Sequence, residues 1–156
     1  MESKNPYAPP KATVEDVSSG AEPPRPAAVT RALQLLWAAV AVSFVSGILN
    51  AFLTETPDVP RGLYLGFMIF GWVAGFLIIW WILTSIARGK NWARIVQLVL
   101  FLFGIVGVLM VFAMPQEVPA AIWVLYAIQM ALNLWGMILL FSPPANAWFR
   151  EMKEWI

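Results

Sequence analysis

The sequence predicts an all-α protein: a four-helix transmembrane bundle with a disordered N-terminal tail and an interfacial C-terminal amphipathic helix. The main observation is that four long stretches contain no charged residue: 32–54, 62–87, 95–116 and 118–149. A hydrocarbon core about 30 Å thick is crossed by roughly 20 apolar helical residues, so each stretch is long enough. Composition agrees, because 60% of the residues are hydrophobic and only 12% are charged.

The first element is a polar, proline-rich segment without apolar periodicity. Residues 1–30 contain six of the twelve prolines, and such a composition cannot bury enough apolar surface to fold. We therefore predict a disordered cytoplasmic tail over 1–30. A docking peptide that enters an aromatic groove of a partner is the alternative. The first apolar run begins only after Arg31, so a cleavable signal peptide is not expected.

The membrane domain, 31–142, divides into four predicted spans. Proline and glycine interrupt or end helices, and they stand in every connection. The spans lie between these residues, at 32–53, 62–87, 95–114 and 120–142, and Pro143 and Pro144 follow the last one.

Lys and Arg are distributed unequally between the two sides of these spans. In an even-pass protein the tail, the middle turn and the C-terminal segment share one side. Only Arg61 lies on the other side, with Glu55, Asp58 and Glu117. Cytoplasmic segments are the ones enriched in Lys and Arg, so we predict that both termini are cytoplasmic. Nine of the ten basic residues support this orientation: Lys4, Lys11, Arg25, Arg31, Arg88, Lys90, Arg94, Arg150 and Lys153.

The last element, 143–156, predicts an amphipathic helix that is too short to cross a membrane. Charged residues occupy one face at helical spacing. Tryptophan and phenylalanine on the other face suit the boundary between lipid headgroups and acyl chains. We predict an interfacial anchor on the cytoplasmic surface, and partner binding through the same face is the alternative. The apolar face consists of Ala145, Trp148, Phe149, Met152, Trp155 and Ile156.

Small and polar side chains form one stripe on the first span and one on the fourth. Polar side chains in lipid turn inward and hydrogen-bond between helices, so the stripes predict a packing seam between these spans. A binding site for a small neutral molecule uses the same residue types and is the alternative. The candidate residues of this polar seam are Ser43, Ser46, Asn50, Tyr126, Gln129 and Asn133.

The second span carries two pairs of glycines at a spacing that lets helix backbones approach closely. The pairs are Gly62 with Gly66 and Gly71 with Gly75, and they face opposite directions on a helix. One pair can pack inside the bundle and the other against a second subunit. The pattern therefore indicates a homodimer through one of the two pairs.

The usual carriers of chemistry are missing from the spans. The chain has no cysteine and no histidine, which removes thiol nucleophiles, thiolate metal ligands and the commonest proton carrier near neutral pH. Ser43, Ser46, Thr84 and Ser85 have no base at their depth, and the spans hold no ionisable group for proton-coupled transport. We expect no enzyme activity, no catalytic residue, no metal and no cofactor. Nucleic acid is not an expected partner.

Three short segments resemble parts of a known group of proteins. They are 5–10 (NPYAPP), 89–94 (GKNWAR) and 142–149 (SPPANAWF). They look like the corresponding segments of small, uncharacterised four-pass inner-membrane proteins of Gram-negative bacteria. The resemblance implies a bacterial inner membrane location. It brings no activity and no site residues.

The leading functional hypothesis is a non-enzymatic accessory or scaffold protein that acts through helix contacts with a membrane-protein partner in the lipid bilayer. The predicted outer connections, about five and eight residues long, leave no room for a receptor domain. One alternative is a small transporter or channel for neutral or lipophilic solutes that uses the polar seam. The other is an immunity-type protein against an envelope-acting toxin.

Overall fold

The computed structural model describes residues 22–53, 60–113 and 118–155. Within these ranges the chain is helical, without strands, and its first four helices are long and apolar enough to cross a membrane. The predicted all-α fold with four spans is therefore confirmed. The helices are α1 (Ala27–Leu53), α2 (Arg61–Ala87), α3 (Asn91–Ala113), α4 (Ala120–Leu140) and α5 (Pro143–Trp155).

The N-terminal boundary of the membrane domain differs from the prediction. α1 begins at Ala27, directly after Pro26, and Arg31 is exposed one turn inside the helix. The residues before α1 are held by other elements. The guanidinium of Arg25 donates to the main-chain oxygen of Ala87 at 2.6 Å, and the carbonyl of Pro23 accepts from the indole of Trp148 at 3.1 Å. A disordered tail that extends to residue 30 is thus wrong for 22–30, while 1–21 lies outside the described residues.

The turn between α2 and α3 is shorter than predicted, because α3 already begins at Asn91. Gly89 has a φ of +74°, in the left-handed region that glycine adopts without a steric penalty. Its amide donates to Ile86 and the amide of Lys90 donates to Ser85. These two bonds satisfy two of the last carbonyls of α2, which is how a glycine commonly ends a helix.

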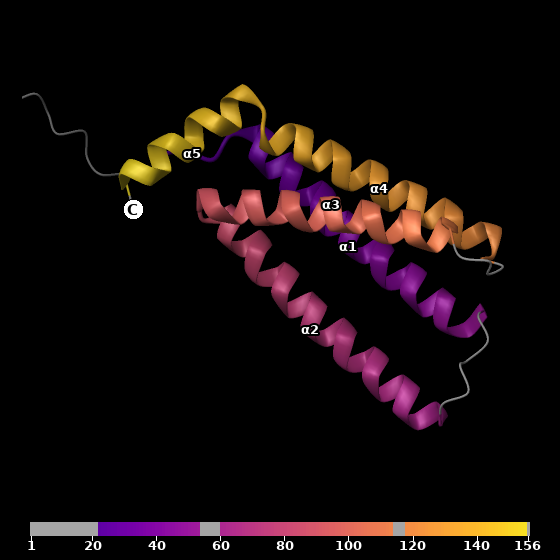
Figure 1. Cartoon of the computed structure of the whole chain (residues 1–156). Helices are drawn as coiled ribbons and strands as arrows, with labels where there is room; N and C mark the ends of the chain where they lie inside the picture. The colour runs from indigo at the N-terminus through magenta and orange to yellow at the C-terminus, as the bar shows by residue number, and fades with distance from the viewer. Residues whose placement is uncertain (1–21, 54–59, 114–117, 156) are drawn as a thin grey trace, which may run out of the picture.

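α1 and α4 lie side by side along most of their length, and they form the closest helix pair (Figure 1). A Cβ added at Gly136 of α4 would lie 3.1 Å from the side chain of Leu36 on α1. The absence of a side chain at Gly136 therefore permits this close approach. The first and fourth spans are thus packed against each other in this region.

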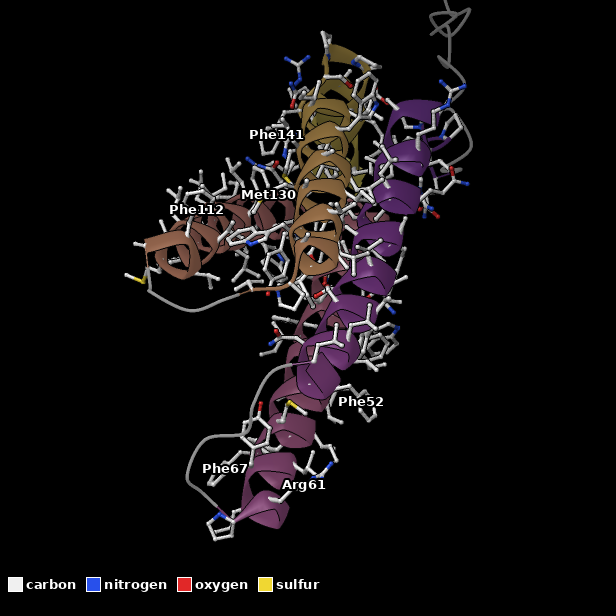
Figure 2. All side chains as sticks on the ribbon, turned by 90° about the vertical axis from the view of Figure 1, so that its right-hand side faces the viewer. Phe52, Arg61, Phe67, Phe112, Met130 and Phe141 are labelled. Atoms are coloured by element: carbon white, nitrogen blue, oxygen red, sulfur yellow. The ribbon has the colours of Figure 1, made fainter. Side chains whose placement is uncertain are left out.

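α2 and α3 instead diverge from their common turn (Figure 1). Figure 2 shows the result at the far ends: Arg61 and Phe67 on α2 lie well away from Phe112 on α3. Phe67 and Phe112 are largely exposed, as are many other large apolar side chains of the four long helices. The predicted four-helix bundle is therefore closed at one end only. We call the end that carries the α2–α3 turn and α5 the closed end.

The hydrophobic core lies at the closed end. Residues from all five helices contribute to it, including Leu36 of α1, Ile86 of α2, Ala93 of α3 and Leu140 of α4. Helix α5 adds four buried apolar residues to the same core: Ala145, Trp148, Phe149 and Met152.

The position of α5 corrects one part of the prediction. The helix is amphipathic, as expected, but four of the six residues of its predicted apolar face are buried against protein, so these four do not face lipid. Trp148, Phe149 and Met152 are at most 3% exposed, and Met152 rests on Gly89 in the α2–α3 turn. The physical reason is that Gly89 leaves room for a side chain, so α5 can fold across the helix ends. The side chain of Trp155 and all of Ile156 lie outside the described residues.

Arg94 links α3 to α5 at the closed end. Its guanidinium donates to the side-chain oxygen of Asn146 at 2.6 Å and lies over the rings of Phe149 and Phe141, at 4.6 and 5.1 Å. The side-chain amide of Asn146 in turn donates to the carbonyl of Phe141 at 2.8 Å. Cation–π contacts of this kind strengthen when they are partly desolvated. The interaction fixes the start of α5 against α3.

Candidate ligand cavity between the four long helices

A cavity of about 340 Å³ lies where α1, α2, α3 and α4 face one another. A second hollow of about 180 Å³ shares five lining residues with it and continues toward Leu36 and Leu83 of the core. Sites for small molecules commonly have volumes of about 300–1,000 Å³. We call the larger space the central cavity. Its lining residues are Ser43, Gly47, Trp72, Ile79, Gln97, Leu100, Phe101, Gly104, Val108, Tyr126, Gln129, Met130 and Asn133.

Four of the six residues predicted for the polar seam line the central cavity: Ser43 of α1 and Tyr126, Gln129 and Asn133 of α4. The other two do not belong to this lining. Ser46 is buried within α1, and Asn50 is partly buried closer to the end of that helix. The structure thus brings four of the six seam residues together. They surround the central cavity and do not simply pack against each other between α1 and α4.

The hydrogen bonds of two seam residues run within their own helices. The hydroxyl of Ser46 donates to the carbonyl of Val42 at 2.8 Å, and the side-chain amide of Asn133 donates to the carbonyl of Gln129 at 2.9 Å. Serine on a helix readily bonds to the carbonyl four residues earlier. The expectation that such groups join spans one and four by hydrogen bonds does not hold for these two side chains.

Gln97 of α3 belongs to the cavity but was not among the residues predicted from the sequence. It is only 5% exposed, and its Oε1 is buried without a hydrogen-bond partner in the described part of the chain. A buried acceptor left unpaired costs about 1–3 kcal/mol. One sequence signal could have found it, since Gln97 is the only residue of the predicted span 95–114 with a hydroxyl or amide side chain.

The chemistry of the lining defines what the central cavity can hold. None of its lining residues is charged. Across the described ranges, no group of three or more His, Cys, Asp or Glu side chains lies close enough to hold a metal ion. The lining offers hydroxyl and amide groups on an otherwise apolar wall. This arrangement suits a neutral molecule that can hydrogen-bond with hydroxyl and amide groups.

The glycine pairs of α2 do not bring another helix of this chain close. A Cβ added at Gly62, Gly66, Gly71 or Gly75 would meet nothing within 4 Å. The expectation that one pair packs inside the bundle is therefore wrong, because α2 diverges from its neighbours.

The close contact between α1 and α2 lies at a different glycine. A Cβ added at Gly47 would lie 2.8 Å from Cζ2 of Trp72, and both residues line the central cavity. The missing side chain at Gly47 therefore lets Trp72 form part of the cavity wall.

Comparison of the chain with protein-family models, with curated proteins and with solved structures found no match. The class of the protein therefore follows from its own fold. Its four long helices are apolar enough to span a membrane, and much of their outer surface consists of large exposed hydrophobic side chains. These features point to a multi-pass integral membrane protein.

Proposed function

We propose that the protein resides in the bacterial inner membrane with both termini in the cytoplasm and binds a small neutral molecule in the central cavity. The observation that carries this proposal is that five residues with hydroxyl or amide side chains line one uncharged cavity: Ser43, Gln97, Tyr126, Gln129 and Asn133. Such side chains can hydrogen-bond a neutral ligand, while the apolar remainder of the wall covers its carbon atoms. The proposal takes up the binding-site alternative for the polar seam.

The shape of the site favours binding over packing alone. A seam that only joins helices is filled by side chains, because protein interiors are close-packed. Here Ser43, Gln97 and Gln129 border a space of about 340 Å³. The orientation is supported by the basic residues in the described part of the chain, since all of them except Arg61 lie at the closed end or beside it. With that orientation the cavity is closed toward the cytoplasm.

Single-cysteine labelling tests whether the cavity admits small neutral molecules, and the chain is suited to it because it contains no cysteine. A thiol reacts as the thiolate, which forms in water and not in an apolar surrounding. We expect N-ethylmaleimide to label Ser43→Cys in membrane vesicles several-fold faster than two controls. Leu36→Cys places the thiol in the core, and Phe67→Cys places it on the exposed surface of α2. Equal rates at the three positions would overturn the proposal.

The accessory or scaffold hypothesis is the second candidate, and the open faces of α2 favour it. The glycine pairs of α2 leave space for a backbone that the described part of the chain does not supply. A second copy is the simplest partner. Disulfide formation between copies of Gly66→Cys in membranes, absent for Leu109→Cys on the exposed face of α3, would support it. If neither variant forms a disulfide between copies, the scaffold hypothesis fails for a homodimer.

A further inference from the structure

A separate hollow, distinct from the two spaces described above, lies on the outer surface between α3 and α4. It has a volume of about 370 Å³ and is lined only by apolar residues. Leu109 and Leu134 are more than half exposed, so this surface faces the lipid. We call it the α3–α4 groove, and its lining residues are Phe101, Ile105, Val108, Leu109, Met130, Ala131 and Leu134.

The groove and the central cavity are neighbours. Phe101, Val108 and Met130 line both spaces, and all three are only partly buried. Figure 2 shows Met130 on the side of α4 that faces α3. Methionine is unbranched and flexible, so it can move aside. The partition between lipid and cavity is therefore one layer of side chains.

A glycine weakens this partition further. Gly104 lies between Phe101 and Val108 on the same face of α3 and lines the central cavity. A Cβ added there would meet nothing within 4 Å. The partition is therefore thinner on its cavity side at this position, since Gly104 places no side chain between Phe101 and Val108.

The two connected spaces have different chemistry. The central cavity offers hydroxyl and amide groups, whereas the groove is wholly apolar. A molecule that fills both therefore has a polar end and an apolar end. The head must be neutral, since no charged residue lines the cavity and an unpaired charge in an apolar medium is costly. It must also hydrogen-bond with the hydroxyl and amide groups of the cavity lining.

We infer that the ligand is an amphipath with a neutral, hydroxyl-bearing head and a single apolar chain. The head lies in the central cavity and the chain lies in the α3–α4 groove, which the ligand reaches sideways from the bilayer. A hollow of about 230 Å³ between α1 and α2 also adjoins the cavity, but it is smaller and Ser43 forms part of its lining. The inference rests on the proposed function and names the class of ligand.

The test uses protection of the Ser43→Cys thiol in the full-length protein reconstituted in phosphatidylcholine nanodiscs. The probe is monooleoylglycerol, which combines a neutral diol head with one acyl chain. We expect it to slow labelling by N-ethylmaleimide. Glycerol has the head without the chain, oleate has the chain with a charged head, and neither should protect at the same concentration.

Each outcome separates the inference from the proposed function. If monooleoylglycerol does not slow the labelling, the inference is overturned. The cavity then remains a site for another neutral molecule. Equal protection by glycerol shows that the chain is not bound, and equal protection by oleate shows that the head is not recognised, so either result also overturns it. Absence of any labelling refutes the proposed function and the inference with it.

Two further substitutions, each added to Ser43→Cys, locate the ligand. Ala131→Trp fills the groove and should weaken protection by monooleoylglycerol about tenfold or more without slowing labelling in its absence. Ala38→Trp is the matched control, since Ala38 is exposed on α1 and lines neither space. Gln97→Leu should weaken protection about two- to tenfold while the protein stays folded. Unchanged protection in both Ala131→Trp and Gln97→Leu would refute the placement.

Discussion

Replacing Gly89 with alanine should destabilise the closed end, because two separate costs meet at this position. The φ of Gly89 is +74°, and a left-handed conformation costs an L-residue roughly 1–2 kcal/mol. The added Cβ would also lie 2.7 Å from Cγ and 2.8 Å from Cβ of Met152. Since such short contacts cannot persist, Met152 or the whole of α5 must move.

The size of the effect follows from the burial of Met152, which is 1% exposed. Complete loss of a buried methionine side chain costs about 2–5 kcal/mol, and its displacement forfeits part of that. We therefore expect Gly89→Ala to lower the free energy of unfolding by about 3–5 kcal/mol. In a Met152→Ala background only the contact with Cβ remains, so the same change should cost about 2 kcal/mol. The difference is the coupling between the two residues.

The measurement is equilibrium unfolding in mixed micelles of mild and denaturing detergent, followed by tryptophan fluorescence because Trp148 is buried at the closed end. Gly107→Ala on α3 is the control, since a Cβ there meets nothing within 4 Å. It should raise stability by about 0.5–1 kcal/mol, as glycine weakens helices. A Gly89→Ala variant as stable as Gly107→Ala would refute the docking of α5 on the α2–α3 turn.

Three further predictions address α5, the polar seam and the topology. Phe149→Ala should cost about 3–5 kcal/mol, because Phe149 is 2% exposed, whereas Glu151→Ala on the exposed face should stay within about 0.5 kcal/mol. Similar values for the two would show that lipid, and not protein, holds the helix. Ser46→Ala should cost at most about 1 kcal/mol, because its hydroxyl bonds within α1, and a larger loss would reveal a bond to another helix. A reporter that is active only in the periplasm should be silent when fused after Ile156 and active when inserted at Asp58. The reverse pattern would invert the orientation.

The number of spans and most of their limits could be predicted from the sequence, because both depend on properties that accumulate along the chain. A run of about 20 apolar residues must cross the bilayer as a helix, since no other single segment satisfies its own backbone there. The second span was predicted at 62–87 and α2 runs from Arg61 to Ala87. The fourth was predicted at 120–142 and α4 ends at Leu140. The larger deviation at α1 arises because the helix begins directly after Pro26, whose carbonyl accepts from the amides of Val29 and Thr30.

The candidate site could be predicted only in part. Ser43, Gln129 and Asn133 recur at helical spacing on two spans, so their shared faces were visible in the sequence. Gln97 stands alone on its span and has no periodic pattern to mark it. Its place in the central cavity depends on how α3 crosses the other helices, which no local property specifies.

The surroundings of α5 were decided by the tertiary structure alone. Its sequence establishes an apolar face that includes Trp148 and Phe149, and such a face must be removed from water. Lipid and a protein core are both apolar, so the pattern is the same whichever of them covers the face. Whether lipid or protein covers the face depends on the space that Gly89 leaves for Met152 and on the hydrogen bond from Arg94 to Asn146. These contacts join residues far apart in the chain, and they exist only once the helix ends have met.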